Sequence, residues 1–177
     1  SIVYDIKIGK DTVLLINNHL ESNKLTREDK VVYEDMLKDP KAGKVKSGIR
    51  QLVNKLAEAS AIRSAQARAI AQEIARSPYP SVIVCGDFND MPSSYTYRAM
   101  KGDLHDGFKD CGSGYGGTFR HFKGLLRIDY MFYNDAFSGE RYYTLDVPYS
   151  DHKPVLMDFS FRSGETDHGS GKTGSER

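Results

Sequence analysis

The chain has 177 residues, a formal charge of +1 at pH 7 and two cysteines. This length suffices for one domain with a sizeable core, and the near-neutral charge excludes a global field that attracts nucleic acid or an anionic membrane. No run of about 18 apolar residues occurs, which excludes a membrane-spanning helix, and two cysteines do not imply a disulfide framework.

The apolar patterns predict strands around a group of helices. In chain order we expect strands at 2–8 and 13–16, a short helix near 30–37, helical spacing over 45–56, a helix at 61–76, a strand at 82–85, a short helix at 91–100, and strands at 128–133, 142–147 and 155–161. The charged stretch 24–58 is either a solvated helical insertion or a substrate-side lid.

Strands outnumber helices, and the helices fall within one connection. This pattern favours an α+β or layered α/β architecture in which antiparallel pairing dominates. We expect residues 1–161 to form the domain. Residues 162–177 contain no bulky apolar side chain and are expected to form a flexible polar tail.

Polar side chains recur where the predicted strands end. The four segments are Asn18-His19-Leu20-Glu21, Gly86-Asp87-Phe88-Asn89, Arg127-Ile128-Asp129-Tyr130 and Ser150-Asp151-His152. Asp87 and Asn89 are two residues apart, so on extended chain they point the same way and could position a water and bind a metal or phosphate. A polar turn closing the strand is the alternative.

The other three segments add carboxylates and imidazoles. Asp151 could hold a cation while His152 acts on a phosphate or water, although a lone histidine is more often a surface or core residue. Asp129 interrupts an apolar strand and would need a partner such as an imidazole, unless it faces outward. His19 alone would be a loop residue. The joint occurrence favours one shared sheet edge suited to metal-assisted phosphate ester hydrolysis.

In this order and context, the segments resemble the endonuclease/exonuclease/phosphatase (DNase I-like) superfamily from about residue 2 to residue 161. The resemblance includes the helix that contains Arg63, Gln66 and Ala67. It implies a four-layered α/β sandwich with two sheets packed face to face and helices outside. It also implies a metal-dependent phosphoesterase that hydrolyses a phosphodiester by water attack, with nucleic acid among the candidate substrates.

The resemblance carries roles onto individual residues. Asp87 would orient or deprotonate the attacking water, and Asn89 would hold that water or the phosphate. His152 would contact the scissile phosphate while Asp129 holds its ring, and His19 would match a second histidine that stabilises the phosphate. Oxygen ligands favour Mg²⁺ or Mn²⁺, and the metal would be bound by Asp87, Asn89 and Asp151.

One departure from the family pattern concerns the metal site. Family members open with a strand ending in Asn and a strand ending in a metal-binding Glu, and neither precedes the hairpin at 2–16. We therefore expect the C-terminal part of a catalytic domain, lacking its N-terminal strands and weak or inactive alone. The incomplete sandwich would expose a sheet edge or face, so self-association is expected.

The substrate and the compartment are not indicated by the sequence. A non-catalytic scaffold of the same fold remains an alternative, as does a phosphatase or phosphodiesterase acting on an inositol phosphate or phospholipid head group. Aromatic and basic residues near the motifs fit a nucleic-acid phosphate; they are Tyr95, Tyr97, Arg120, His121, Lys123 and Arg127.

Overall fold

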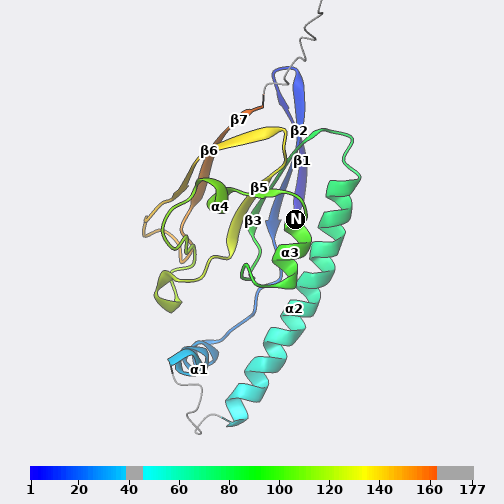
Figure 1. The fold of residues 1–177 in the computed structure, drawn as a ribbon. Coiled ribbons are helices and arrows are strands. Elements are labelled where there is room, and N and C mark those ends of the chain that lie inside the picture. Colours follow the sequence, from blue (N-terminus) through cyan, green and yellow to red (C-terminus); the bar gives the residue numbers. More distant parts are fainter. Residues whose placement is uncertain (39–45, 163–177) are drawn as a thin grey trace, which may run out of the picture.

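The structure is a computed structural model that describes residues 1–38 and 46–162 (Figure 1). Its elements are β1 (Ile2–Ile8), β2 (Asp11–His19), α1 (Arg27–Lys38), α2 (Lys46–Ala75), β3 (Ser81–Asp87), α3 (Tyr95–Lys101), β4 (His105–Asp106), α4 (Gly107–Cys111), the 3-10 helix η1 (Phe122–Gly124), β5 (Asp129–Tyr133), β6 (Phe137–Thr144) and β7 (Val155–Phe161).

Most predicted elements are present, and several boundaries were wrong. The helical patterns on either side of residue 60 form one continuous α2, because no Gly or Pro interrupts the chain there. α3 starts later than predicted, since Ser94 is its N-cap and accepts a hydrogen bond from Tyr97 N at 3.1 Å. β6 begins at Phe137 because pairing with β7 extends it, and β4 and α4 are too short for a periodic pattern.

The strands form two sheets, and antiparallel pairing dominates as predicted. The larger sheet has five strands in the order β1-β2-β3-β5-β4, and only β2 and β3 run parallel. α1 and α2 lie in the connection between these two strands, as a parallel crossover requires. The smaller sheet pairs β6 with β7.

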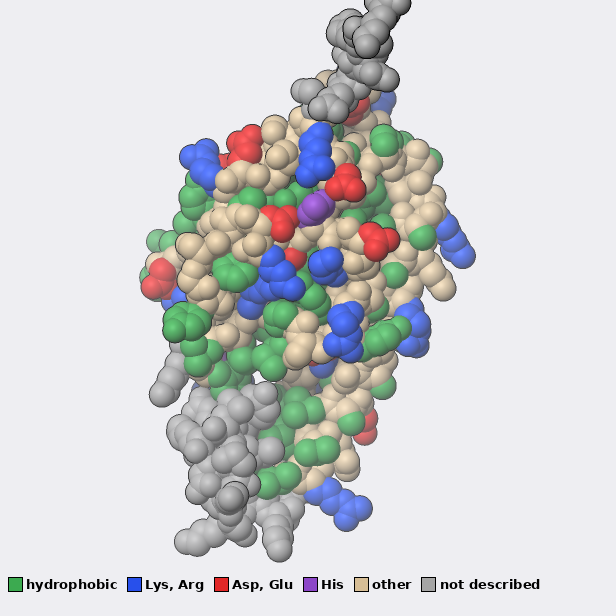
Figure 2. Space-filling model, viewed as in Figure 1, with side chains coloured by type: hydrophobic (Ala, Val, Ile, Leu, Met, Phe, Trp, Pro, Cys, Tyr) green, Lys and Arg blue, Asp and Glu red, His purple; other side chains and the backbone are tan. Residues whose placement is uncertain are grey.

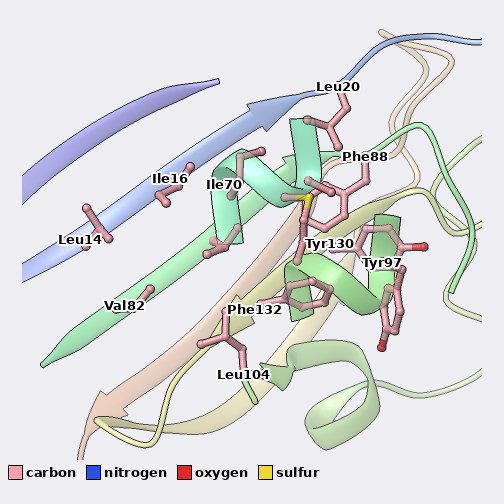
Figure 3. Packing of buried hydrophobic residues seen from close by; sticks show 13 residues of the cluster. Leu14, Ile16, Leu20, Ile70, Val82, Phe88, Tyr97, Leu104, Tyr130 and Phe132 are labelled. Atoms are coloured by element: carbon pink, nitrogen blue, oxygen red, sulfur yellow. The ribbon is translucent and has the colours of Figure 1, made fainter. Parts of the chain in front are cut away.

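One face of the five-stranded sheet packs against helices. Leu14 and Ile16 from β2 are buried there with Ala67 and Ile70 from α2 and Met100 from α3 (Figure 3). The phenylalanine and tyrosine rings of β5 and its neighbours complete this core, which is the larger of the two. Burial of these side chains supplies the main favourable term in folding.

The other face of the same sheet packs against the β6–β7 pair. Val13, Ile83 and Tyr133 point to this side because side chains alternate along a strand, and they contact Phe137 and Phe159. Figure 1 shows the resulting order of layers, with helices, the larger sheet and the smaller sheet in succession. The mixed α/β architecture agrees with the DNase I-like fold class.

A close approach of β2 and β3 fixes the edge where the polar segments meet. Gly86 has φ +121°, and a Cβ there would lie 2.0 Å from Asn18 O, so only glycine fits. Asn18 is buried and donates from Nδ2 to Cys85 O at 3.0 Å. These contacts hold the ends of both strands side by side.

The periphery of the domain is less covered. All seven residues of β1 are exposed, and Figure 2 shows charges of both signs interspersed with apolar side chains on one face of the molecule.

Arg162, the last described residue, donates its backbone N–H to Ala136 O; the rest of the predicted tail, 163–177, lies outside the described residues. Among the described helices, none is long and apolar enough to cross a bilayer.

Candidate active site

Strand register brings three of the predicted residues into one row. His19 at the end of β2 pairs with Asp87 at the end of β3, and Asp87 pairs with Asp129 at the start of β5. All three belong to the strand face that packs toward the smaller sheet, together with Val13. The predicted convergence of these three at one sheet edge is therefore present.

His152 reaches the row from the segment preceding β7. An isolated antiparallel bridge pairs it with Phe119, and the two rings lie 5.0 Å apart. Its Nδ1 lies 2.9 Å from Asp129 Oδ2, and its Nε2 lies 3.9 Å from Asp87 Oδ2. The imidazole therefore stands between two carboxylates, with Nδ1 held and Nε2 facing Asp87.

The backbone beneath Asp129 is fixed by a buried hydroxyl. Thr118 Oγ1 accepts hydrogen bonds from both Ile128 N and Asp129 N at 3.1 Å. Thr118 is completely buried, so these bonds are shielded from water. The packing of Thr118 therefore holds the backbone from which the Asp129 carboxylate extends toward His152.

Asn89 orients Asp87 through two hydrogen bonds. The Asn89 backbone N–H donates to Asp87 Oδ1 at 2.8 Å, and its Nδ2 donates to Asp87 Oδ2 at 3.0 Å. Asn89 adopts φ +51°, an uncommon conformation that Asn tolerates better than most residues. Nδ2 also donates to Leu20 O, which leaves Oδ1 as the acceptor that Asn89 can offer to a ligand.

Charge and burial shift the protonation of this cluster. The hydrogen bond with Asp129 raises the pKa of His152 above 6.5, although partial burial acts against it. Burial raises the pKa of Asp87 above 3.8, and the neighbouring Asp129 charge adds to this. A histidine whose charged form is favoured, beside a carboxylate of increased basicity, suits proton transfer and anion binding.

His19, Asp87, Asn89 and His152 border a cleft of about 500 Å³, whereas Asp129 lines a neighbouring cavity that His152 also borders. The cleft is also lined by residues of α1, of α2 and of the segment 119–126, among them Lys30, Leu56, Phe119 and Phe122. Phe119 lies beside His152, and Lys30 Nζ lies 6.0 Å from the centre of the Phe119 ring. The cleft thus combines carboxylates with apolar and basic side chains.

Arg63 lines the cleft and connects the two segments at its edge. In the sequence analysis it was part of the helix that resembles the family and had no role assigned. Its guanidinium donates to Asp90 Oδ2 at 3.1 Å, to Glu21 O at 3.0 Å and to Asn23 Oδ1 at 2.8 Å. The side chain is almost fully buried. It ties the segment after β2 to the segment after β3, so we interpret it as structural support for the site.

Asp87, Asp129 and His152 form a group that could hold a metal ion, with one ligand atom from each lying within 4.8 Å of the others. Asp151, predicted as a metal ligand, also lines the cleft but is outside this group; its carboxylate lies 4.0 Å from His121 Nε2. His19 is largely exposed at the cleft, with Nε2 3.8 Å from Asp87 Oδ2.

Two of the residues assigned to a nucleic-acid surface are instead buried. Arg127 and Tyr97 both bind the Asp106 carboxylate, at 2.8 Å and 2.7 Å, and neither lines the cleft. Arg120 binds Asp146 at 2.5 Å and stays partly exposed. The expectation that Arg127 and Tyr97 contact a nucleic-acid phosphate was wrong, because sequence proximity to a motif does not indicate which way a side chain points.

The sequence also missed residues that complete the site. Thr118 and Phe119 follow the glycines at 116 and 117, and Lys30 lies in the charged insertion. The one sequence signal for these residues was that a β-branched residue, Thr118, and an aromatic residue, Phe119, follow a glycine-rich loop, which is typical of an ordered segment. Their contacts depend on tertiary packing between elements far apart in the chain.

Comparison with solved structures supports the fold. A functionally unknown protein from Enterococcus faecalis V583 matches with a TM-score of 0.61 and 17% identity, over 90% of this chain and 54% of that one. The human Nocturnin catalytic domain with bound sulfate matches with a TM-score of 0.56 and 22% identity, over 90% and 51%. A mannosyl-6-phosphatase from Bacteroides thetaiotaomicron matches with a TM-score of 0.50 and 21% identity, over 86% and 53%.

The chain therefore spans about half the length of these solved chains. No curated protein matches its sequence. The model of the Endonuclease/Exonuclease/phosphatase family matches residues 15–152, which include all the segments that form the row and His152. The chain belongs to the endonuclease/exonuclease/phosphatase family.

Proposed function

We propose that this chain carries catalytic residues of a divalent-metal-dependent phosphoesterase that hydrolyses a phosphodiester by water attack, in the manner of a nuclease. The observation that carries the proposal is the position of His152 between Asp129 and Asp87 at a cleft. A carboxylate base and an imidazolium at the same cleft are the two groups that this reaction needs from the protein.

Asp87 is the proposed base for the attacking water. Burial makes its carboxylate a stronger base than an exposed one, and its two hydrogen bonds to Asn89 fix its direction. As the water oxygen attacks phosphorus, its proton passes to the Asp87 carboxylate, the P–O bond to the leaving group breaks, and the leaving oxygen takes a proton from solvent. Asn89 Oδ1 can orient that water, while Asn89 Nδ2 is committed to the protein.

His152 is the proposed contact to the scissile phosphate. With Nδ1 bound to Asp129, the ring presents Nε2 to the cleft, and the hydrogen bond with Asp129 raises the His152 pKa and so favours the charged form. Charge that develops on the phosphoryl oxygens is stabilised by such a preorganised cation. His19 is exposed at the same edge and is proposed to contact the phosphate or the leaving group.

The oxygen donors at this site fit a hard divalent cation. Asp87 and Asp129 supply carboxylate oxygens, Asn89 an amide oxygen and Asp151 a further carboxylate at the cleft. Oxygen donors of this kind favour Mg²⁺ or Mn²⁺ over zinc. When bound, such an ion supplies positive charge that stabilises the phosphoryl oxygens and the leaving group.

The lining of the cleft favours a substrate with organic groups around the phosphate. Lys30, Phe119 and Phe122 suit an aromatic or apolar group next to a negative charge. We therefore place a nucleic acid first. The sugar phosphatase among the matched structures supports testing a phosphomonoester as the second candidate.

The test is hydrolysis of a substrate panel with Mg²⁺, Mn²⁺ or EDTA. The panel holds single- and double-stranded DNA, RNA, a chromogenic phosphodiester, a sugar phosphate, an inositol polyphosphate and sphingomyelin. Because the chain spans about half of the solved chains, we expect slow turnover, and Mn²⁺ binding is measured in parallel by electron paramagnetic resonance.

His152→Ala is compared with His105→Ala. The wild-type His105 ring lies between Asp110 and Asp135 and does not line the cleft. We expect metal-dependent hydrolysis that only His152→Ala removes. Hydrolysis that persists in EDTA, or that both variants lose equally, would contradict the proposal. Mn²⁺ binding without hydrolysis of any substrate would favour a binding scaffold of the same fold.

A further inference from the structure

Uncommon backbone conformations gather at the cleft. Among the described residues other than glycine, a positive φ occurs at Lys24 (+48°), Asn89 (+51°) and Phe122 (+54°), and all three line the cleft. Such values are rare without glycine, and a bulky side chain such as that of phenylalanine makes them unfavourable. Strain of this kind persists where the surrounding structure enforces it, and it is concentrated at binding and catalytic sites. Asn89 orients the proposed base, whereas the other two bends lie in segments that take no part in the proposed proton transfer.

The bend at Lys24 leads the chain from β2 into α1, which lies beyond the end of that strand and beside the first half of α2 (Figure 1). The linking segment is held at its start by the buried Arg63, whose guanidinium donates to Glu21 O at 3.0 Å and to Asn23 Oδ1 at 2.8 Å. The path from the sheet edge to α1 is therefore fixed by a group inside the domain.

The start of α1 is fixed by the carboxylate of Asp29. Asp29 Oδ2 accepts a hydrogen bond from Thr26 N at 2.9 Å, and Thr26 Oγ1 accepts one from Asp29 N at 3.2 Å, so the two residues cap the helix reciprocally. The same Asp29 oxygen lies 2.5 Å from Lys55 Nζ of α2. The next residue, Lys30, therefore lines the cleft from a turn that is tied both to its own helix and to α2.

Lys30 differs from the other lysine and arginine side chains that line the cleft. Lys24 and Arg63 each pair with a carboxylate, at 2.7 Å and 3.1 Å. Among the side chains that the structure describes, no carboxylate lies within ion-pair distance of Lys30, whose ammonium lies 6.0 Å from the centre of the Phe119 ring. Lys30 also lies near the N-terminus of α1, where the helix dipole disfavours a positive charge. Its charge is therefore available to an anion in the cleft.

The Phe119 ring separates Lys30 from the proposed phosphate contact. The ring centre lies 5.0 Å from the centre of the His152 ring and 6.0 Å from Lys30 Nζ. A ligand that contacts both cations thus needs two anionic groups joined by an organic unit of about the size of a ring, as two phosphates on one sugar are. Leu56 and Phe122 add apolar lining to the same cleft.

We infer that Lys30 binds a second phosphate of the substrate, one sugar away from the phosphate that is hydrolysed, and that α1 is the element that presents it. This inference rests on the proposed function, which places the first phosphate at His152. It adds a substrate class, because compounds with two phosphates joined through a sugar are preferred over compounds with one. Oligonucleotides, nucleoside bisphosphates and sugar bisphosphates share this chemistry.

The kinetic test uses substrates that differ by one phosphate. The dinucleotide TpT has a single phosphate, and pTpT and TpTp carry a second one at the 5′ or the 3′ end. For cleavage of the internal phosphodiester by the full 177-residue chain with Mn²⁺, we expect kcat/KM for pTpT or TpTp to exceed that for TpT about tenfold or more, since a hydrogen bond between charged groups contributes about this factor. Lys30→Met should bring the ratio to about one through KM, and Lys30→Arg should keep most of it.

Arg27→Met is the matched control. Arg27 also lies near the N-terminus of α1, but its side chain is exposed and does not line the cleft. Because exposed charges are largely screened, this variant should leave the ratio unaltered within about twofold. If Lys30 only held the Phe119 ring in place, Lys30→Met would slow the cleavage of all three dinucleotides alike. An unchanged ratio in Lys30→Met, or an equal loss of the ratio in Arg27→Met, would overturn the inference.

Binding in EDTA separates this inference from the proposed hydrolysis. Adenosine 3′,5′-bisphosphate is compared with AMP, and glucose 1,6-bisphosphate with glucose 6-phosphate, by isothermal titration calorimetry. We expect the bisphosphate of at least one pair to bind about tenfold more tightly than its monophosphate, with Lys30→Met removing the difference. A preference in the nucleotide pair alone would identify a nucleotide substrate, and one in both pairs would identify recognition of the phosphates themselves.

The two proposals fail in different ways. If no dinucleotide is cleaved but the bisphosphate preference exists and depends on Lys30, the hydrolysis is refuted and the phosphate subsite stands. If cleavage occurs and His152→Ala removes it, while neither pair shows a preference that depends on Lys30, the hydrolysis stands and the subsite is refuted.

Discussion

Two clusters of charged residues meet in the short segment Arg127-Ile128-Asp129-Tyr130, and they are built in opposite ways. In the buried cluster, Arg127 donates from both terminal nitrogens to the two Asp106 oxygens at 2.8 Å, and Tyr97 adds a third bond. In the cleft cluster, His152 lies between the carboxylates of Asp87 and Asp129, and the exposed His19 lies 3.8 Å from Asp87.

Within these four residues, Arg127 belongs to a cluster that stabilises the fold, whereas Asp129 belongs to a cluster suited to catalysis. The Arg127–Asp106 pair is sealed, with side-chain exposures of 7% and 1%, and the guanidinium lies 4.8 Å from the Tyr130 ring centre. Asp87 and Asp129 are each 17% exposed, and both imidazoles near Asp87 lie 3.8 to 3.9 Å from it, beyond hydrogen-bond distance. A cluster whose charges are fully paired holds a fold, whereas one that is left short of positive charge attracts a cation.

Arg127→Met should have the largest effect on stability. It leaves the Asp106 carboxylate buried without its bidentate partner, which typically costs about 3–5 kcal/mol. Urea unfolding measures the loss. Arg141→Met is the matched control, because Arg141 pairs with Asp158 on the exposed β6–β7 sheet and should cost no more than about 1 kcal/mol. Equal losses in the two variants would refute the structural role given to the buried cluster.

Asp129→Asn should chiefly affect the cleft cluster. It keeps the shape of the side chain but removes the charge that favours the His152 imidazolium, so we expect turnover to fall about 10- to 100-fold, the range seen for groups that orient catalytic ligands. Nuclear magnetic resonance should show the His152 pKa, raised above 6.5 in the wild type, moving downward.

A lowered His152 pKa with unchanged turnover would rule out the proposed role of the imidazolium. Unfolding of Asp129→Asn by urea supplies the control, since Asp129 is partly exposed and should contribute little to stability. If this variant lost as much stability as Arg127→Met, the distinction between the two clusters would fail.

Thr118→Val tests the element that joins the two clusters. The change removes the acceptor of two buried N–H groups, those of Ile128 and Asp129, and unsatisfied buried donors cost about 1–3 kcal/mol. We expect intermediate destabilisation, read from thermal unfolding, together with reduced turnover. Thr118→Ser keeps the acceptor and should recover most of both; failure of this recovery would assign the effect to packing.

The cleft cluster could be predicted from the sequence because register follows from simple rules. Strand ends placed His19, Asp87 and Asp129 at one edge. Asp87 and Asn89 meet through a polar turn after β3, with Asn89 at φ +51°, and the expectation that extended chain points them the same way was wrong. A carboxylate in an apolar strand predicted an imidazole partner, and His152 is that partner.

The buried cluster could not be predicted in this way. Asp106 ends a two-residue strand without a periodic signal, and it binds Arg127 only because β4 pairs with β5. Arg127 itself precedes β5, so strand alternation does not determine its direction. Sequence patterns locate residues that share a strand end, but pairing between a short edge strand and a neighbouring loop depends on the packed core.

The smallest expected effect is a difference in titration between Asp106 and Asp87. Burial alone would raise the pKa of Asp106, but hydrogen bonds from Arg127 and Tyr97 lower it below 3.8. Asp106 thus contributes stability that is present above its unfolded pKa and is lost as pH falls through its folded pKa. Burial raises the pKa of Asp87, so Asp87 contributes stability that is present at low pH and lost as pH rises through its folded pKa.

Carboxyl ¹³C titration in EDTA measures both groups, with Asp106→Asn and Asp87→Asn used for assignment. We expect Asp87 to titrate above 3.8 and Asp106 below it, so that on acidification the cleft carboxylate is neutralised before the buried one. The reverse order would mean that the cleft is the better compensated of the two clusters. That result would remove the electrostatic reason for placing a cation beside Asp87 and His152.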